Sequence, residues 1–140
     1  MSMEHLTVDL DGVHLESLLD AWQRILGSDA MPMLVTALGD VFVQDVPSGR
    51  VSFLQTSSGQ FEAVCGSADE LQALLENPEF VEHYFDPAAV STLDASGLAR
   101  GPDEVFTLLV PGWEGGDWEG DNIVVRGVVE HLARAPHRAS

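Results

Sequence analysis

The segment from residue 111 to residue 122 combines large aromatic side chains with clustered negative charges. Two tryptophans stand there among four carboxylates and four glycines. Tryptophan is enriched at the energetic centres of protein interfaces, and carboxylates pair with arginine and lysine of a basic partner. We predict a partner-binding surface here; the alternative is that both indoles fold inward and the acids form a solvated rim. The candidate partner-binding residues are Trp113, Glu114, Asp117, Trp118, Glu119 and Asp121.

The same segment resembles the start of a calcium-binding loop only superficially. An EF-hand loop counted from Asp117 needs glycine at its sixth position and glutamate at its twelfth. This chain has Asn122 and Val128 there. Its five histidines are scattered and its one cysteine, Cys65, stands alone, so zinc-ligand spacing is absent. We therefore predict no metal and no cofactor.

Catalytic signatures are also missing from the sequence. The nucleophile elbow, the zinc-protease helix, the phosphate-binding loop and the dinucleotide fingerprint do not occur. Acidic pairs are abundant, but acid–base catalysis needs two carboxyls whose environments separate their pKa values. We predict that the protein is not an enzyme and assign no catalytic residues. A small-ligand-binding or hydrolytic domain, closed by the glycine-rich segment over a pocket, is the competing hypothesis.

The net charge of the chain limits the classes of partner that it can bind. The 140 residues include 23 acidic side chains and six basic ones, all arginine, for a formal net charge of -17. Such a surface repels phosphate backbones and anionic lipid headgroups, so we expect no nucleic-acid or membrane binding and predict a basic protein partner. The acidic start and the lack of a long apolar stretch lead us to expect a cytoplasmic protein.

These residues must be positioned by a small fold. Apolar residues at helical spacing predict a helix over residues 14–26 that ends at Gly27. Four short alternating segments with turn residues between them then predict an antiparallel meander. Ser67 and Glu70 form a capping-box pattern before the next helix, and further helices are expected to follow. A strand near residues 105–110, a neighbour at 123–125 and a short helix from Val128 complete the order.

Strands that are grouped rather than alternating with helices favour an α+β architecture. We predict an antiparallel sheet of three to five strands with several helices in a single layer on one face. The chain should form one domain over residues 1–140, with flexible ends at residues 1–13 and 136–140.

Several motifs resemble those of one known family. Thr36-x-x-Gly39-Asp40-x-Phe42, the hairpin ending at Gly59, and the Gly115-Gly116 pair match its motifs in order. The family is the C-terminal domain of immunity proteins that protect bacteria from DNase effectors of the type VI secretion system. The chain departs from it at Gln55, where the family commonly has aspartate, and at Trp113-Glu114. The resemblance gives structural roles to Thr36, Gly39, Asp40, Phe42, Gly59, Gly115 and Gly116.

The resemblance implies an immunity-type protein that neutralises a cognate toxic effector, a nuclease, by direct binding through an acidic surface. A nuclease carries a basic surface for DNA, which an acidic protein can occupy without chemistry. The alternative is an acidic protein-interaction adaptor unrelated to toxins.

Overall fold

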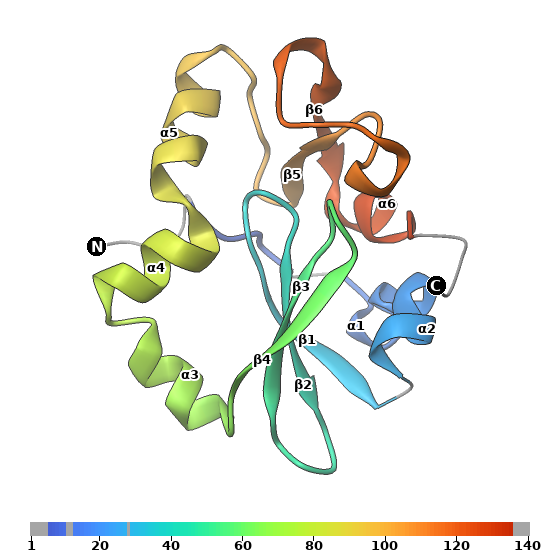
Figure 1. Ribbon diagram of the computed structural model, residues 1–140, viewed down its shortest axis with the longest axis vertical. Coiled ribbons are helices and arrows are strands. Elements are labelled where there is room, and N and C mark those ends of the chain that lie inside the picture. The colour runs from blue at the N-terminus through green and yellow to red at the C-terminus, as the bar shows by residue number, and fades with distance from the viewer. Residues whose placement is uncertain (1–5, 11–12, 28, 136–140) are drawn as a thin grey trace.

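The computed structural model describes residues 6–10, 13–27 and 29–135, and its centre is an antiparallel meander (Figure 1). The four strands follow one another in the order of the chain, with a glycine of positive φ in each connecting turn. This confirms the predicted sheet and the α+β architecture. The strands are β1 (Ala30–Val35), β2 (Val41–Asp45), β3 (Val51–Gln55) and β4 (Gln60–Cys65).

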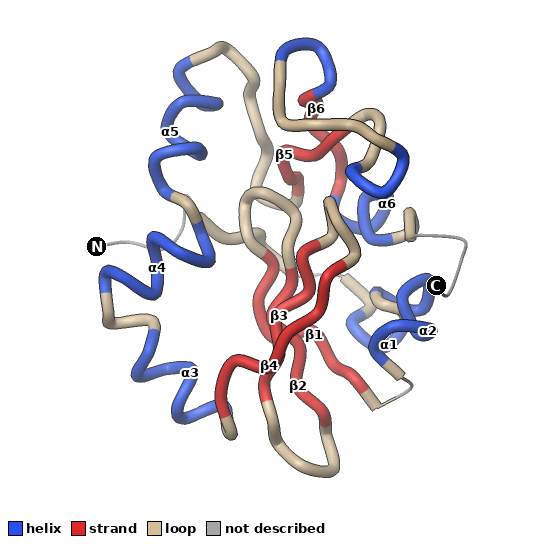
Figure 2. The backbone as a smooth tube through the Cα atoms, viewed as in Figure 1, coloured by secondary structure: helices blue, strands red, loops and turns tan. Residues whose placement is uncertain are grey.

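Both faces of the meander are covered, which corrects the expected single layer of helices on one face. Side chains alternate across a strand, so Phe42 points to one face while Val41 and Val43 point to the other. Phe42 belongs to one buried apolar cluster and the two valines belong to a second. The uninterrupted apolar triplet 41–43 was the sequence signal for two-sided burial. Figure 2 shows helices on both sides of the strands.

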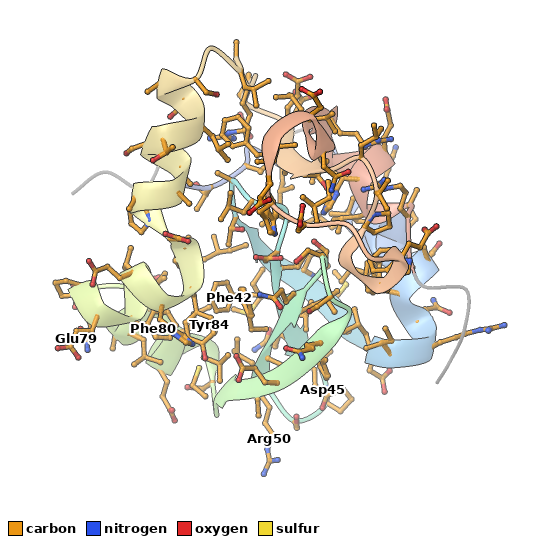
Figure 3. The ribbon with its side chains drawn as sticks, turned by 45° about the horizontal axis from the view of Figure 1, so that its top comes forward. Phe42, Asp45, Arg50, Glu79, Phe80 and Tyr84 are labelled. Carbon is orange, nitrogen blue, oxygen red and sulfur yellow. The ribbon has the colours of Figure 1, made fainter. Side chains whose placement is uncertain are left out.

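Three helices pack against the Phe42 face: α3 (Ala68–Leu74), α4 (Pro78–Phe85) and α5 (Pro87–Ala95). The Ser67 hydroxyl accepts the Glu70 amide at 3.2 Å, which confirms the predicted start of α3. The Glu70 carboxylate reaches the Gly66 amide, one residue before the expected one. Proline opens both α4 and α5, where its missing amide proton costs nothing. Phe42 contacts Phe80 and Tyr84 of α4, as Figure 3 shows.

The opposite face is covered by the N-terminal segment. The predicted helix over residues 14–26 is broken into α1 (Leu15–Leu18), a 3-10 turn η1 (Asp20–Trp22) and α2 (Gln23–Leu26). The Ser17 hydroxyl bonds the His14 carbonyl, an interaction that competes with the helical ladder. The tighter turn still buries Leu18, Leu19 and Trp22. Gly27 ends the segment with a φ of 81°, as predicted.

Part of the stretch that we expected to be a flexible end is folded. Leu6 and Val8 are buried, and Thr7 pairs with Thr36 next to β1. Residues 6–8 therefore extend the core. The rest of the expected ends, residues 1–5, 11–12 and 136–140, lies outside the described residues.

A second, two-stranded sheet closes the fold and confirms the predicted late strand pair. β5 (Glu104–Leu108) pairs antiparallel with β6 (Ile123–Gly127), which leads directly into α6 (Val128–Leu132). The Phe106 amide donates to the Ala37 carbonyl at 2.8 Å and so joins this sheet to the meander. Between the strands lie the 3-10 turns η2 (Gly112–Glu114) and η3 (Gly120–Asn122). Within the described ranges, no helix combines the length and the apolar character needed to cross a membrane.

Candidate functional site

The β5–β6 connection, residues 111–122, is held in one shape by Asn122; we name it the clamped loop. The Asn122 side chain accepts the Val110 amide at 2.8 Å and donates to the carbonyls of Val110 and Asp117 at 3.0 and 2.8 Å. One side chain thus joins the start, middle and end of the loop. Hydrogen bonds to backbone groups substitute here for regular secondary structure.

Two glycines let the clamped loop close. A Cβ atom at Gly116 would collide with the Val110 carbonyl oxygen, and one at Gly112 would collide with the Ser57 carbonyl. The loop therefore lies directly against the β3–β4 turn. Gly115 has a φ of 94°, a conformation that other residues rarely adopt. Gly115 and Gly116 thus allow the backbone conformation and the close approach of the loop.

The two tryptophans of the clamped loop face different surroundings. Trp113 is half-buried and packs edge-on against the buried Trp22, with ring centroids 5.8 Å apart. Trp118 is 38% exposed. All four loop carboxylates are exposed, and Glu114 also lies close enough to Arg134 to affect its pKa. Of the six candidate residues, only Trp113 is therefore packed against the core, and the other five are exposed.

Trp118 borders a hollow between the clamped loop, the meander and helices α4 and α5. Its volume is about 490 Å³, and the carboxylates of Asp40 and Asp86 lie in its wall. Phe61 and Glu62 line a second hollow of about 530 Å³. The two hollows share four wall residues, so we treat them as one aromatic groove. The shared residues are Phe53, Gln55, His83 and Tyr84.

The aromatic groove is acidic as well as aromatic. Three carboxylates line it, and among the described residues of its walls there is no arginine. Another hollow, of about 660 Å³ beside Trp113, is different because Arg24 and Arg134 line it. Burial and the nearby Glu62 carboxylate raise the pKa of Tyr84, so the phenol stays protonated near neutral pH. A cationic or hydrogen-bond-donating group would suit the groove.

Behind the groove lies a buried polar cluster that we name the Asp40 network, made of Thr36, Gly39, Asp40, Thr56 and His131. Asp40 is 7% exposed, and its Oδ1 atom accepts the Thr56 amide at 3.0 Å. The Thr36 hydroxyl accepts the Asp40 amide at 3.1 Å. The network therefore ties the β1–β2 turn to the β3–β4 turn.

His131 of α6 completes the Asp40 network. Its Nε2 atom lies 3.0 Å from the Gly39 carbonyl and 2.9 Å from the Thr56 hydroxyl. Because a carbonyl only accepts, Nε2 carries the proton and Nδ1 has none. Nδ1 is buried without a hydrogen-bond partner among the described residues. A Cβ atom at Gly39 would collide with the imidazole, so glycine is required for this approach.

Burial shifts the two titratable groups of the network in opposite directions. It raises the pKa of Asp40 to about 7, against the opposing effect of the hydrogen bonds from Thr56. Burial also lowers the pKa of His131 to about 4, although its bond to the Gly39 carbonyl opposes this. The imidazole is therefore neutral at pH 7 while the carboxyl titrates there.

The motif residues expected to be structural have identifiable contacts. Thr36, Gly39 and Asp40 belong to the Asp40 network. Phe42 stands at the centre of the aromatic cluster under α4. Gly59 has a φ of 79° in the β3–β4 turn. Asp40 also lines the groove, a position that the motif did not predict.

Several groove residues were missed by the sequence analysis. Tyr84, Asp86 and Phe61 come from two different elements and a helix junction, so no local spacing connects them. His131, which the sequence analysis did not single out, is 4% exposed. Asp86 carries one available signal, since Asp-Pro between two helical patterns is typical of a helix start. No metal-binding cluster occurs within the described ranges.

Comparison with known proteins adds no family assignment. No protein-family model matches the chain, and no curated protein matches it.

Proposed function

We propose that this chain is an immunity-type inhibitor, which neutralises a basic toxic effector, a nuclease, by occupying its cationic surface. The observation that supports this most is the aromatic groove, where three carboxylates and four aromatic side chains line adjoining hollows without an arginine. The net charge of -17 adds long-range attraction to a cationic partner. Binding alone suffices for inhibition, since the bound protein excludes DNA.

The clamped loop supports the same proposal. Asp117, Trp118 and Glu119 are exposed on a segment that Asn122 already holds in place. A surface ordered before binding loses less conformational entropy when the partner arrives. An exposed tryptophan among carboxylates combines a large apolar contact with charge pairing.

The test is binding and inhibition with the products of the genes adjacent to this one. We expect a one-to-one complex whose affinity falls steeply with salt, and suppression of DNA cleavage by the partner. Trp118→Ala should weaken the complex about tenfold or more, as expected of an interface hot spot. Val129→Ala is the matched control, because Val129 is also exposed but lies on α6. Affinity that is indifferent to salt, or absent for every neighbouring product, rejects the proposal.

A small-ligand-binding domain is the second candidate. The observation in its favour is the carboxyl of Asp40, which is buried in the wall of a hollow of about 490 Å³ and has a pKa of about 7. Pockets for small molecules have volumes of about 300–1,000 Å³. Saturable binding of a small cation to the isolated chain, together with no protein partner, would favour this candidate.

A further inference from the structure

The carboxylate of Asp40 is only half satisfied by the protein. Its Oδ1 atom accepts hydrogen bonds from the amide and the hydroxyl of Thr56, at 3.0 and 3.4 Å. Within the described part of the chain, Oδ2 has no donor. The side chain is more than nine-tenths buried, and the cavity that it lines is the Trp118 end of the aromatic groove. Oδ2 is not fully enclosed by the protein, so it can accept a hydrogen bond from a donor brought by a ligand.

A second carboxylate stands in the same wall. Asp86 joins α4 to α5 with a φ of 46°, and its Oδ1 accepts the Ala89 amide at 3.3 Å. The helix junction fixes the position of this exposed side chain. Two carboxylates in one hollow, with no arginine among its described wall residues, select a ligand that carries positive charge and several donors.

Aromatic rings form part of the remaining wall. Tyr84 contacts the rings of Phe42 and Phe53 with centroid separations of 5.5 and 4.8 Å, so its ring is held firmly. Trp118, on the clamped loop, lines the same hollow. Aromatic rings in the wall of an acidic hollow provide a stacking surface for a planar cation.

We propose that this hollow receives one arginine side chain of the basic partner, bound by Asp40 and stacked against Tyr84 and Trp118. The inference rests on the proposed function and names the contact at its centre. A guanidinium fits better than an ammonium, because it is planar, weakly hydrated and carries five donors. Asp40 and Asp86 would take donors on one side while the rings contact the faces of the guanidinium.

The direct test uses the full chain and a blocked tripeptide with a central arginine, glycine on both sides and neutral ends. We expect the peptide to shift the NMR signals of the Trp118 indole and of residues around Asp40. The same peptide with citrulline, which has nearly the same shape but no charge, should bind about tenfold more weakly or worse. Equal binding of both peptides, or shifts spread over the whole acidic surface, overturns the inference.

Variants locate the contact. Asp40→Asn and Trp118→Ala should each weaken arginine-peptide binding several-fold. Asp86→Asn provides a third arm that does not depend on the buried network, since asparagine also caps helices and tolerates positive φ. Glu76→Gln is the matched control: it removes one exposed carboxylate in the turn after α3, outside the groove. If folded Asp86→Asn and Trp118→Ala proteins bind as tightly as the Glu76→Gln protein, the assignment is wrong.

The two proposals fail in different ways. If a basic effector binds with salt-dependent affinity and none of the groove variants weakens the complex, the arginine site is wrong and the inhibitor function stands. If the arginine peptide binds at Trp118 and no neighbouring gene product does, the groove is a cation site and the inhibitor function is wrong.

Discussion

The Asp40 network and the clamped loop use the same construction with opposite outcomes. In each, a short polar side chain bonds backbone groups of distant residues while glycines allow close approach. The Asp40 network turns its polar atoms inward, apart from the carboxylate edge that reaches the groove. The clamped loop bonds its backbone internally and leaves Asp117, Glu119 and Asp121 in solvent. One region holds elements together, and the other keeps charge available for a partner.

Gly39 of the Asp40 network should be difficult to replace. Gly39→Ala places a Cβ atom against the His131 ring and imposes a positive φ on alanine. Together, the strained backbone and the displaced buried imidazole should lower the free energy of unfolding by about 3 kcal/mol. Urea denaturation followed by circular dichroism measures the loss.

Gly27→Ala is the control for that experiment. Gly27 has a similar φ of 81°, but nothing lies within 4 Å of its missing Cβ. The Gly27→Ala variant should lose only the stability that the strained backbone costs, about 1 kcal/mol of unfolding free energy. Equal losses at Gly39 and Gly27 would show that the His131 contact contributes nothing to stability.

The two tryptophans should separate stability from binding within the clamped loop. Trp113→Ala removes a half-buried ring that packs on Trp22 and should cost about 2 kcal/mol of stability, less than a fully buried tryptophan. Trp118→Ala removes an exposed ring and should change stability by no more than about 0.5 kcal/mol. Thermal unfolding of both variants, compared under identical conditions, measures the contrast. Similar losses would mean that Trp118 is also a packing residue.

Much of the scaffold could be predicted because its signals are local. Ser67 and Glu70 mark the start of α3 within four residues, and Gly27 ends the N-terminal helical segment. The alternation that predicts the meander is also a property of short segments. The Asp40 network could not be predicted, since His131 and Gly39 are 92 residues apart and only the fold brings them together.

The candidate site was predicted in part for the same reason. The clamped loop stood out by composition, and the structure leaves Trp118 exposed on it. The opposite wall of the groove comes from Tyr84 and Asp86, which looked like ordinary helix residues in the sequence. The different roles of Trp113 and Trp118 depend on Trp22, which packs against only one of them.

The pH dependence of the free energy of unfolding should report on the titratable groups of the Asp40 network. The pKa of Asp40 is about 7, above its ordinary value of 3.8, so the folded state holds this proton more tightly than the unfolded state. Its contribution to stability is therefore present below pH 4 and is lost as the pH rises to 7. His131, with a pKa of about 4, acts in the opposite direction between pH 4 and 6.5.

The Asp40→Asn variant should separate the contributions of Asp40 and His131 to the pH dependence of stability. Without the carboxyl, only the His131 contribution remains of this pair, and stability relative to the original chain should increase from pH 4 to 7 by about 3 kcal/mol. Urea denaturation at a series of pH values gives the difference directly. A difference that does not change with pH would mean that Asp40 titrates normally, and its carboxyl carbon signal in NMR would then move near pH 4.

The outward acids should have the smallest effect on stability and a clear effect on association. Glu119→Gln and Asp121→Asn each remove one exposed charge from the clamped loop and should change unfolding free energy by less than about 0.5 kcal/mol. Charges at the rim of an interface act mainly on the association rate, so each variant should bind a basic partner more slowly at low salt. Stopped-flow kinetics at low and high salt measures this, with Glu76→Gln, in the turn after α3, as the control. If the control slows association equally, net charge alone steers the partner and the position of the loop is irrelevant.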